Sequence, residues 1–417
     1  MAATDALTPE SLRAQVADWL AANWDPDVPL IEWRRRLLDA GWAAPSWPKQ
    51  WHGAGLPPWT DGVVADTLID GGAVASPVGG AMSLAGPTIL DVGPDSVRER
   101  FLEPILTGEE TWCQLFSEPG AGSDLAGLQT TAVRDGDEWV VNGQKVWTTS
   151  AHHADLGMLL ARTDPSKPKH SGITYFAQPM KQEGVVVRPL RQMNFHQSFN
   201  EVFLSDARVP HENVIGEVGG GWNAARATLM HERRLGRQRP PNYSDAPGRA
   251  LTEARHEADE YFAVYGWYPQ RVGRVDLVIP HAQAAGLTSD PLIRQEIARL
   301  VTLQRVSGWT SDRARARRAS GQPPGPEGSI GKLSASRIAQ EAARVHTRIA
   351  GASGMVRGDD APFDGLIAEV LLSTPAQSIA GGTDEIQKNI LGERILGLPR
   401  EAAPDRNVPF NETRRNA

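Results

Sequence analysis

The stretch Gln114-Leu-Phe-Ser-Glu-Pro-Gly-Ala-Gly-Ser-Asp124 is the most informative part of this sequence. Its apolar start predicts a strand that delivers Phe116 and Ser117 to a turn. Glycines such as Gly122 would leave backbone N–H groups of that turn open, and Ser123 would add a small hydroxyl donor. Such a turn suits a flat ligand with polar edges, although a glycine turn alone is also typical of an ordinary hairpin bend.

Two further segments carry groups of the same kind. In Asn142-Gly-Gln-Lys-Val-Trp-Thr-Thr149, Trp147 offers an aromatic plane and Thr149 a hydroxyl two residues later. Because side chains alternate along a strand, we expect both groups on one face. The third segment, Gly381-Gly-Thr-Asp-Glu-Ile-Gln-Lys-Asn-Ile-Leu391, lies near the end of the chain.

The first half of the chain divides into a helical and a β-rich region. Apolar residues recur at three- and four-residue spacing from Thr8 to about Leu106, and Thr8-Pro9 is a helix-start signal. Short β-rich runs follow, separated by turn pairs such as Asp135-Gly136 and Asn142-Gly143. These runs predict a compact β-barrel or sandwich.

Helical periodicity returns after Gly219-Gly220-Gly221 and is interrupted at Pro240-Pro241. We interpret the interruption as an inserted loop that contains a helix, and we expect the polar end of the chain to be held loosely. The predicted regions are a helical N-terminal domain at 1–110, a β domain at 111–214, a helical C-terminal domain at 215–400 with an insertion at about 236–287, and a polar tail at 401–417.

Composition excludes several classes of protein. A net charge of −7 is unlike the basic balance of most nucleic-acid-binding proteins. Cys113 is the single cysteine, so no intrachain disulfide is possible, and His152-His153 and His196 lack the spacing of metal ligands. The N-terminus lacks the features of a signal peptide, and no window reaches the apolar length of a membrane span. We therefore expect a soluble cytoplasmic protein without a metal.

The three quoted segments resemble the flavin-binding signatures of the acyl-CoA dehydrogenase family, and the likeness extends in order over nearly the whole chain. The resemblance implies a multidomain α and β fold with an N-terminal helical domain, a central β-barrel or sandwich domain and a C-terminal four-helix bundle. It also implies an FAD cofactor, whose ring edge meets the backbone around Phe116 and the Ser117 hydroxyl. The implied cofactor-binding residues are Phe116, Ser117, Gly122, Ser123, Trp147, Thr149, Thr383 and Glu385.

The position of the catalytic base departs from the commonest family pattern. Many members carry a glutamate two residues before the threonine of the C-terminal Gly-Thr signature, where this chain has Gly381. A second branch, which includes isovaleryl-CoA and long-chain dehydrogenases, carries the base on the helix after the β domain, and Met230-His-Glu-Arg233 resembles its motif. The resemblance implies that Glu232 removes the α-proton of an acyl-CoA and that FAD accepts the β-hydride. The Gly381 N–H would bind the thioester oxygen, and Arg233 would support the site.

The resemblance also bears on partners. It implies an acyl-CoA substrate, an electron-transfer flavoprotein or similar acceptor, and a homo- or hetero-oligomer, either a dimer or a tetramer. The ending Gly392-Glu-Arg-Ile-Leu-Gly-Leu-Pro-Arg400 is similar to a bacterial group whose members act in fatty acid or steroid side-chain catabolism. Two alternatives stay open: a non-catalytic or cofactor-sharing subunit of a hetero-oligomer, and a flavin oxidase or N-hydroxylase on the same fold.

Overall fold

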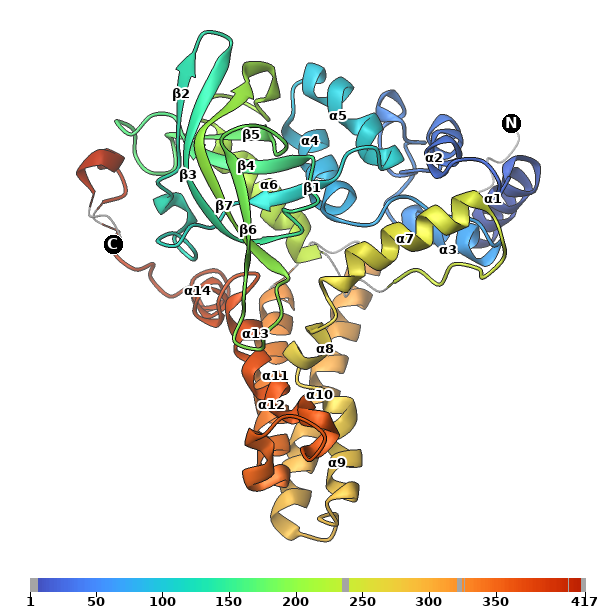
Figure 1. The fold of residues 1–417 in the computed structure, drawn as a ribbon, viewed down its shortest axis with the longest axis vertical. Coiled ribbons are helices and arrows are strands. Elements are labelled where there is room, and N and C mark those ends of the chain that lie inside the picture. Colours follow the sequence, from blue (N-terminus) through green and yellow to red (C-terminus); the bar gives the residue numbers. More distant parts are fainter. Residues whose placement is uncertain (1–6, 235–239, 321–324, 326, 404, 414–417) are drawn as a thin grey trace. The chain divides into compact units, whose positions relative to one another are not determined.

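The computed structural model describes residues 7–234, 240–320, 325, 327–403 and 405–413 (Figure 1). The chain forms two compact units, which we call the first and the second unit. The first unit comprises Met1–Leu190, Ser198–Val264 and Pro404–Ala417, and the second comprises Arg191–Gln197 and Tyr265–Ala403. No helix within the described ranges is long and apolar enough to cross a membrane.

The first unit begins with the predicted helical region. The Thr8 hydroxyl accepts a hydrogen bond from the Ser11 N–H at 3.2 Å, and Pro9 occupies the first helical turn, which confirms the predicted helix start. Residues at the predicted spacing, Leu12, Val16 and Leu20, are buried. The helices are α1 (Pro9–Asn23), α2 (Leu30–Asp39), α3 (Thr60–Asp70), α4 (Gly86–Val92) and α5 (Asp95–Thr107), with a 3-10 turn at Lys49–Trp51 and a π turn at Ala81–Ala85.

A curled sheet follows in the first unit (Figure 1). Its strands are β1 (Trp112–Leu115), β2 (Thr131–Asp135), β3 (Glu138–Thr149), β4 (Leu156–Arg162), β5 (Ile173–Pro179), β6 (Val185–Leu190) and β7 (Phe199–Pro210). The order is β1-β4-β2-β3-β7-β6, and β5 pairs with β4. β1 runs parallel to β4, whereas β3 pairs antiparallel with both β2 and β7. Every residue of β4 is buried, so this strand lies inside the β domain.

One predicted turn is wrong. Asp135-Gly136 does lie at the β2–β3 connection, but Asn142-Gly143 lies inside β3, which continues through it while paired with β7. The register between β3 and β7 shifts there and again between Lys145 and Thr148. The glycine is needed for close packing, because a Cβ at Gly143 would lie 2.3 Å from the Thr130 hydroxyl oxygen.

Two helices of the first unit follow the sheet, α6 (Gly221–Arg234) and α7 (Arg249–Ala263). Residues 235–239, at the start of the predicted insertion, lie outside the described residues. α7 lies within that predicted insertion, and it packs on α2 through two carboxylates. Glu257 forms a two-pronged ion pair with the buried Arg34 at 2.7 and 2.9 Å, and Glu253 accepts the Leu30 N–H at the start of α2 at 2.8 Å.

The second unit is a helical bundle (Figure 1). Its longest helices, α10 and α11, pack together, and Val278, Leu300 and Val345 contribute to a buried core between helices. The chain is helical here, as expected, although α6 and α7, which lie within the predicted domain at 215–400, belong to the first unit. Its helices are α8 (Tyr268–Arg271), α9 (Val278–Ala284), α10 (Pro291–Ala319), α11 (Glu327–Ala350), α12 (Leu366–Ser373), α13 (Pro375–Ile379) and α14 (Asp384–Arg394).

Residues 405–413 of the predicted polar tail are not held loosely, contrary to the expectation from their polar composition. Phe410 begins a 3-10 turn, Phe410–Glu412, and only 7% of the residue is exposed. Its N–H donates to the Lys167 carbonyl at 2.9 Å, and its ring lies 3.5 Å from the Arg162 guanidinium carbon. One aromatic residue in a polar tail therefore anchors the tail to the β domain by burial and a cation–π contact.

Candidate active site

The Phe116–Ser117 segment leaves β1 and enters a turn, residues 117–123, which we call the glycine turn. Glu118 and Ala121 close it by exchanging two N–H to carbonyl hydrogen bonds, at 3.0 and 3.1 Å. The Ser117 carbonyl accepts the Val146 N–H at 2.9 Å, which ties the turn to β3. A Cβ built at Gly122 would meet no atom within 4 Å, so this side of the turn is open. The segments 114–124 and 142–149 therefore lie side by side, as a shared ligand site would require.

A buried ion pair supports the glycine turn. Lys145 Nζ lies 2.8 Å from Glu118 Oε1, and the two side chains are 0% and 7% exposed. Burial lowers the pKa of the Lys145 ammonium, and the Glu118 carboxylate offsets only part of this effect. Burial alone would raise the pKa of Glu118, but the Lys145 charge and hydrogen bonds from Thr130 and Gln129 hold it below its usual value. The two side chains are thus each other's partners inside the fold.

Trp147 lies at the second register shift of β3 and is unusual in two respects. Its φ is 64°, in the left-handed region that a bulky residue rarely adopts, and 55% of the residue is exposed. The ring is steadied by an edge contact with Phe199, with centroids 5.7 Å apart. Strained conformations of this kind concentrate at binding sites. The indole provides an aromatic plane, and Ser117, Ser123 and Thr149 provide hydroxyl groups, which are the chemical groups that suit a flavin ring. None of these residues is buried.

Glu232 lies on α6, one turn after a residue that fixes the helix. The buried Thr228 hydroxyl is 3.0 Å from the Tyr175 hydroxyl and 2.9 Å from the Thr88 hydroxyl. Three residues after Thr228, His231 is hydrogen-bonded to Asp91 at 2.8 Å. Positions 228 and 231 are therefore both fastened to α4, which carries Thr88 and Asp91. Glu232 is half-buried, and the neighbouring arginine at position 233 is exposed.

The same hydroxyl network reaches the residue before the glycine turn. The Tyr175 ring meets the Phe116 ring edge-on, with centroids 5.7 Å apart. Burial raises the pKa of Tyr175, and the bond to Thr228 only partly opposes this, so the phenol stays protonated at neutral pH. Sequence reasoning missed this role of Tyr175, because nothing local marks a strand tyrosine as a link between two motifs.

The third quoted segment belongs to the second unit and forms the start of α14. Gly381 and Gly382 have φ values of 67° and 85°, which favour glycine. The Thr383 hydroxyl caps α14 by accepting the Ile386 N–H at 3.3 Å, and Glu385 is exposed in the first turn. Gln387 Nε2 donates to the Gly381 carbonyl at 3.4 Å. The loop that carries Gly381 is thereby tied back to the helix that follows it.

The predicted site residues divide between the two units. The first unit holds Phe116, Ser117, Gly122, Ser123, Trp147, Thr149, Glu232 and Arg233, and the second holds Gly381, Thr383 and Glu385. Within the first unit, the contacts above join the glycine turn, β3 and the helix of Glu232 into one connected framework. Within the second unit, Lys332 donates to the Gln377 carbonyl and lies 3.4 Å from Asp384, bracing the segment before the signature.

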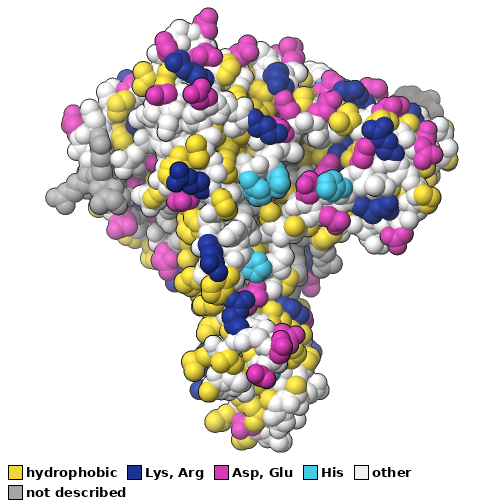
Figure 2. Space-filling view, in the orientation of Figure 1, with side chains coloured by type: hydrophobic (Ala, Val, Ile, Leu, Met, Phe, Trp, Pro, Cys, Tyr) yellow, Lys and Arg dark blue, Asp and Glu magenta, His cyan; other side chains and the backbone are white. Residues whose placement is uncertain are grey.

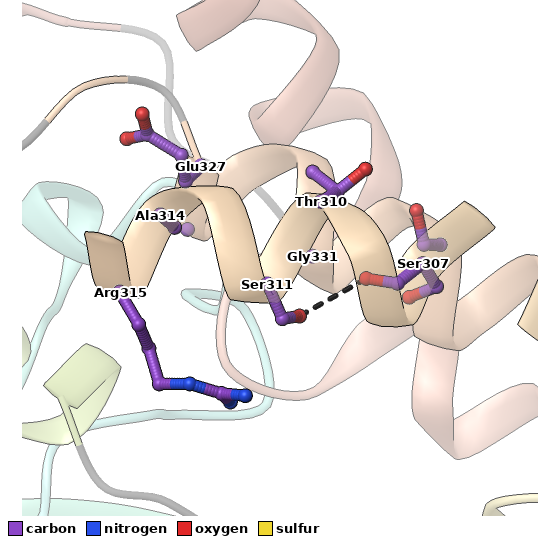
Figure 3. A pocket seen from close by; sticks show the side chains of 9 residues that line it. Ser307, Thr310, Ser311, Ala314, Arg315, Glu327 and Gly331 are labelled. Carbon is purple, nitrogen blue, oxygen red and sulfur yellow. Dashed lines mark hydrogen bonds between the residues drawn. The ribbon is translucent and has the colours of Figure 1, made fainter. Parts of the chain in front are cut away.

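Two surface hollows of the second unit are lined by other residues. One, of about 200 Å³, lies between Ser307–Arg315 of α10 and Glu327–Ser334 of α11 (Figure 3). The other, of about 690 Å³, is lined by residues of α11, α12 and α13, including Ile379. Neither contains a predicted site residue. On the face of the first unit drawn in Figure 2, lysine and arginine side chains are mixed with acidic ones, so no single sign of charge dominates it.

Family models match the chain in three consecutive parts. They are the N-terminal domain of acyl-CoA dehydrogenase at residues 2–109, the middle domain at 113–207 and the C-terminal domain at 279–396. The chain belongs to the acyl-CoA dehydrogenase family, which confirms the predicted family and fold. The family is FAD-dependent, and the matches support flavin-dependent dehydrogenation of an acyl-CoA thioester by this chain.

Relatives of known identity agree with this assignment. Acyl-CoA dehydrogenase FadE34 of Mycobacterium tuberculosis is 38% identical over 87% of this chain, which spans 46% of that protein. Acyl-CoA dehydrogenase IpdE1 of the same organism is 33% identical over 94% of this chain and 98% of its own length. Among solved structures, the ChsE4–ChsE5 complex of Mycobacterium tuberculosis is similar with a TM-score of 0.63 and 28% identity, covering 96% of this chain and 100% of that chain.

Proposed function

We propose that this chain dehydrogenates an acyl-CoA thioester between its α and β carbons, with Glu232 as the base. One observation carries the assignment of the base: the helix turn before Glu232 is fixed by two buried hydrogen bonds of Thr228. A general base needs a defined position, and this anchoring supplies one. Gly381, at the position of the base in many relatives, has no side chain that could replace it.

The chain's own groups fit an FAD cofactor. An exposed indole at Trp147, an open turn at Gly122 and hydroxyls at Ser117 and Thr149 suit a flat ring with polar edges. FAD, when bound, supplies the acceptor for the β-hydride. The start of α14 at Thr383 would serve its polar arm, because a helix start presents N–H groups to anionic ligands, and Glu385 in the same turn would approach its ribose hydroxyls.

Each protein group then has a defined task. Glu232 takes the α-proton as the carboxylate, so it must be ionised before the reaction. Negative charge develops on the thioester oxygen as the proton leaves, and the Gly381 N–H would donate to that oxygen. Arg233, next to the base, would help to position neighbouring groups at this end of α6.

For substrate and assembly we propose a bulky or branched acyl-CoA and a hetero-oligomer. Two similar solved structures carry names of paired chains, the ChsE4–ChsE5 complex and the Tcur3481–Tcur3483 steroid acyl-CoA dehydrogenase, the latter at 25% identity and a TM-score of 0.64 over 94% of this chain and 98% of that chain. A second chain would then contribute to the cofactor site. An electron-transfer flavoprotein would take the electrons onward.

Anaerobic titration of the purified protein with a panel of acyl-CoAs tests this function. We expect loss of the absorbance of oxidised flavin and an enoyl-CoA product that is two hydrogens lighter by mass spectrometry. Bulky or branched substrates should act at lower concentration than short straight-chain ones. The oxidase alternative would be favoured if the purified protein binds FAD, none of the acyl-CoAs bleaches the flavin, and the reduced flavin reacts rapidly with oxygen.

A further inference from the structure

Lys145 makes one contact beyond its ion pair with Glu118, and this contact reaches the start of the glycine turn. Its ammonium donates to the Phe116 carbonyl oxygen at 3.1 Å. A lysine with no exposed side-chain surface is uncommon, because burying an ammonium costs several kcal/mol unless it is fully paired. The carboxylate that pairs with it also accepts the Gln129 and Thr130 N–H groups, at 2.6 and 2.9 Å. The ammonium is therefore fixed at the Phe116 carbonyl.

The Phe116 carbonyl and the Ser117 N–H belong to the same peptide unit. Resonance couples the two groups, so a charged donor on the oxygen withdraws electron density from the nitrogen and makes its N–H a stronger donor. The Ser117 carbonyl is taken by the Val146 N–H. Within the described parts of the chain, no protein acceptor takes the Ser117 N–H, so this strengthened donor is available to a ligand.

We propose that Lys145 sets the reduction potential of the bound flavin through the Phe116–Ser117 peptide, and that Glu118 holds the ammonium in place for this purpose. The proposal rests on the proposed function, since it requires FAD at this turn. Reduction adds negative charge to the flavin ring, and a strong N–H donor backed by a buried cation favours the more negative state. Lys145 acts through Ser117, so it is a positioning residue and touches neither substrate nor cofactor.

The test begins with Lys145→Met, which keeps the approximate length of the side chain and removes its charge. We expect the equilibrium between oxidised and reduced flavin to shift about tenfold toward the oxidised form, equivalent to about 30 mV for a two-electron couple. The potential is measured by equilibrium reduction against a dye, alongside the Kd for oxidised FAD. Lys181→Met is the control, because Lys181 forms an exposed ion pair with Asp155 in the same unit. The reduction potential of the flavin in this variant should match that of the wild type.

Two further variants separate this role from simple support of the fold. Glu118→Gln/Lys145→Met removes both buried charges and should regain much of the thermal stability lost in the single variant. Its potential should stay low, because the charged donor on the Phe116 oxygen is still missing. Lys145→Arg keeps a cation and should lie closer to the wild-type potential.

Distinct outcomes identify which idea fails. If wild-type protein binds no flavin, either alone or co-purified with a partner chain, the proposed function fails and the proposal with it. Suppose instead that the wild type binds FAD and that the flavin of Lys145→Met has the wild-type reduction potential. The role of Lys145 is then overturned, while the proposed function stands. If Lys145→Met does not fold, the reduction potential of the double variant decides in the same way. A double variant that regains both stability and potential also overturns it, because Lys145 then only supports the fold.

Discussion

The Thr228 hydroxyl on α6 lies 3.0 Å from the Tyr175 hydroxyl on β5, and both side chains are fully buried. This bond connects the helix of Glu232 to the strand whose tyrosine packs on Phe116. The first of the predicted cofactor residues and the predicted base thus share one rigid support.

Thr228→Val should lower the free energy of unfolding of the first unit by about 1–3 kcal/mol, because the Tyr175 and Thr88 hydroxyls lose a buried partner. The rate of flavin reduction by acyl-CoA should also fall, since α6 loses its attachment one turn before Glu232. Urea denaturation and stopped-flow absorbance measure the two effects. Thr228→Ser keeps the hydroxyl and is the matched control; equal losses in both variants would show that the methyl group and not the network matters.

Phe410→Ala should release the end of the chain from the β domain. Removing a buried phenylalanine ring from its contact with Arg162 should cost about 1–3 kcal/mol. Limited proteolysis should cut the variant within residues 405–413 faster than the wild type, and thermal unfolding should begin at a lower temperature. Asn411→Ala changes an exposed side chain of the same turn and should behave like the wild type. Unchanged proteolysis of Phe410→Ala would contradict the anchoring role.

The second unit should lose stability in mild acid through a buried histidine pair. His281 Nδ1 lies 3.1 Å from His346 Nδ1, and burial, followed by the charge on His346, lowers the pKa of His281 to about 4. Because an unfolded histidine titrates near 6.5, the unfolded chain binds the extra proton between these values. The contribution of the neutral His281 to the stability of the second unit is therefore complete above about pH 6.5 and is lost as the pH falls toward 4.

At pH 5 this loss should reach about 1–2 kcal/mol relative to pH 7.5. Urea unfolding of the wild type and His281→Gln at both pH values measures it, with the variant showing the smaller difference. The same pH difference in both proteins would place the acid sensitivity elsewhere.

A glutamate introduced in place of Gly381 should not restore activity to Glu232→Gln. Gly381 has a φ of 67°, where a residue with a Cβ is strained by roughly 1–2 kcal/mol. The new side chain would therefore displace the loop whose N–H is needed for the thioester oxygen. Single-turnover reduction by acyl-CoA compares the single and double variants. Recovery of the wild-type rate in Glu232→Gln/Gly381→Glu would contradict this account of the loop.

Much of the fold could be predicted because its signals are local. The spacing of Leu12, Val16 and Leu20 predicts the buried face of α1, and the glycines of residues 117–123 predict the exit from β1. The turn pair Asn142-Gly143 misled because its glycine serves close packing against Thr130 and not a reversal of the chain. Sequence spacing does not distinguish these two uses of glycine.

The contacts that organise the site could not be predicted, because they join positions far apart in the chain. Lys145 and Glu118 stand in two motifs recognised from the sequence, but their pairing depends on the sheet that brings β3 to the end of β1. Thr228 and Tyr175 are separated by 53 positions. The docking of Phe410 on Arg162 depends on folding that a polar tail gives no reason to expect.

The rate of the first flavin reduction in Glu232→Gln tests the central claim most directly. The variant keeps the shape of the side chain and removes the base, so we predict a fall of about 10²–10⁴-fold or more under anaerobic conditions, with bound FAD and its spectrum retained. Glu212→Gln, an exposed carboxylate of the same unit, is the control and should reduce at the wild-type rate. Reduction of Glu232→Gln at the wild-type rate would contradict the assignment of Glu232 as the base.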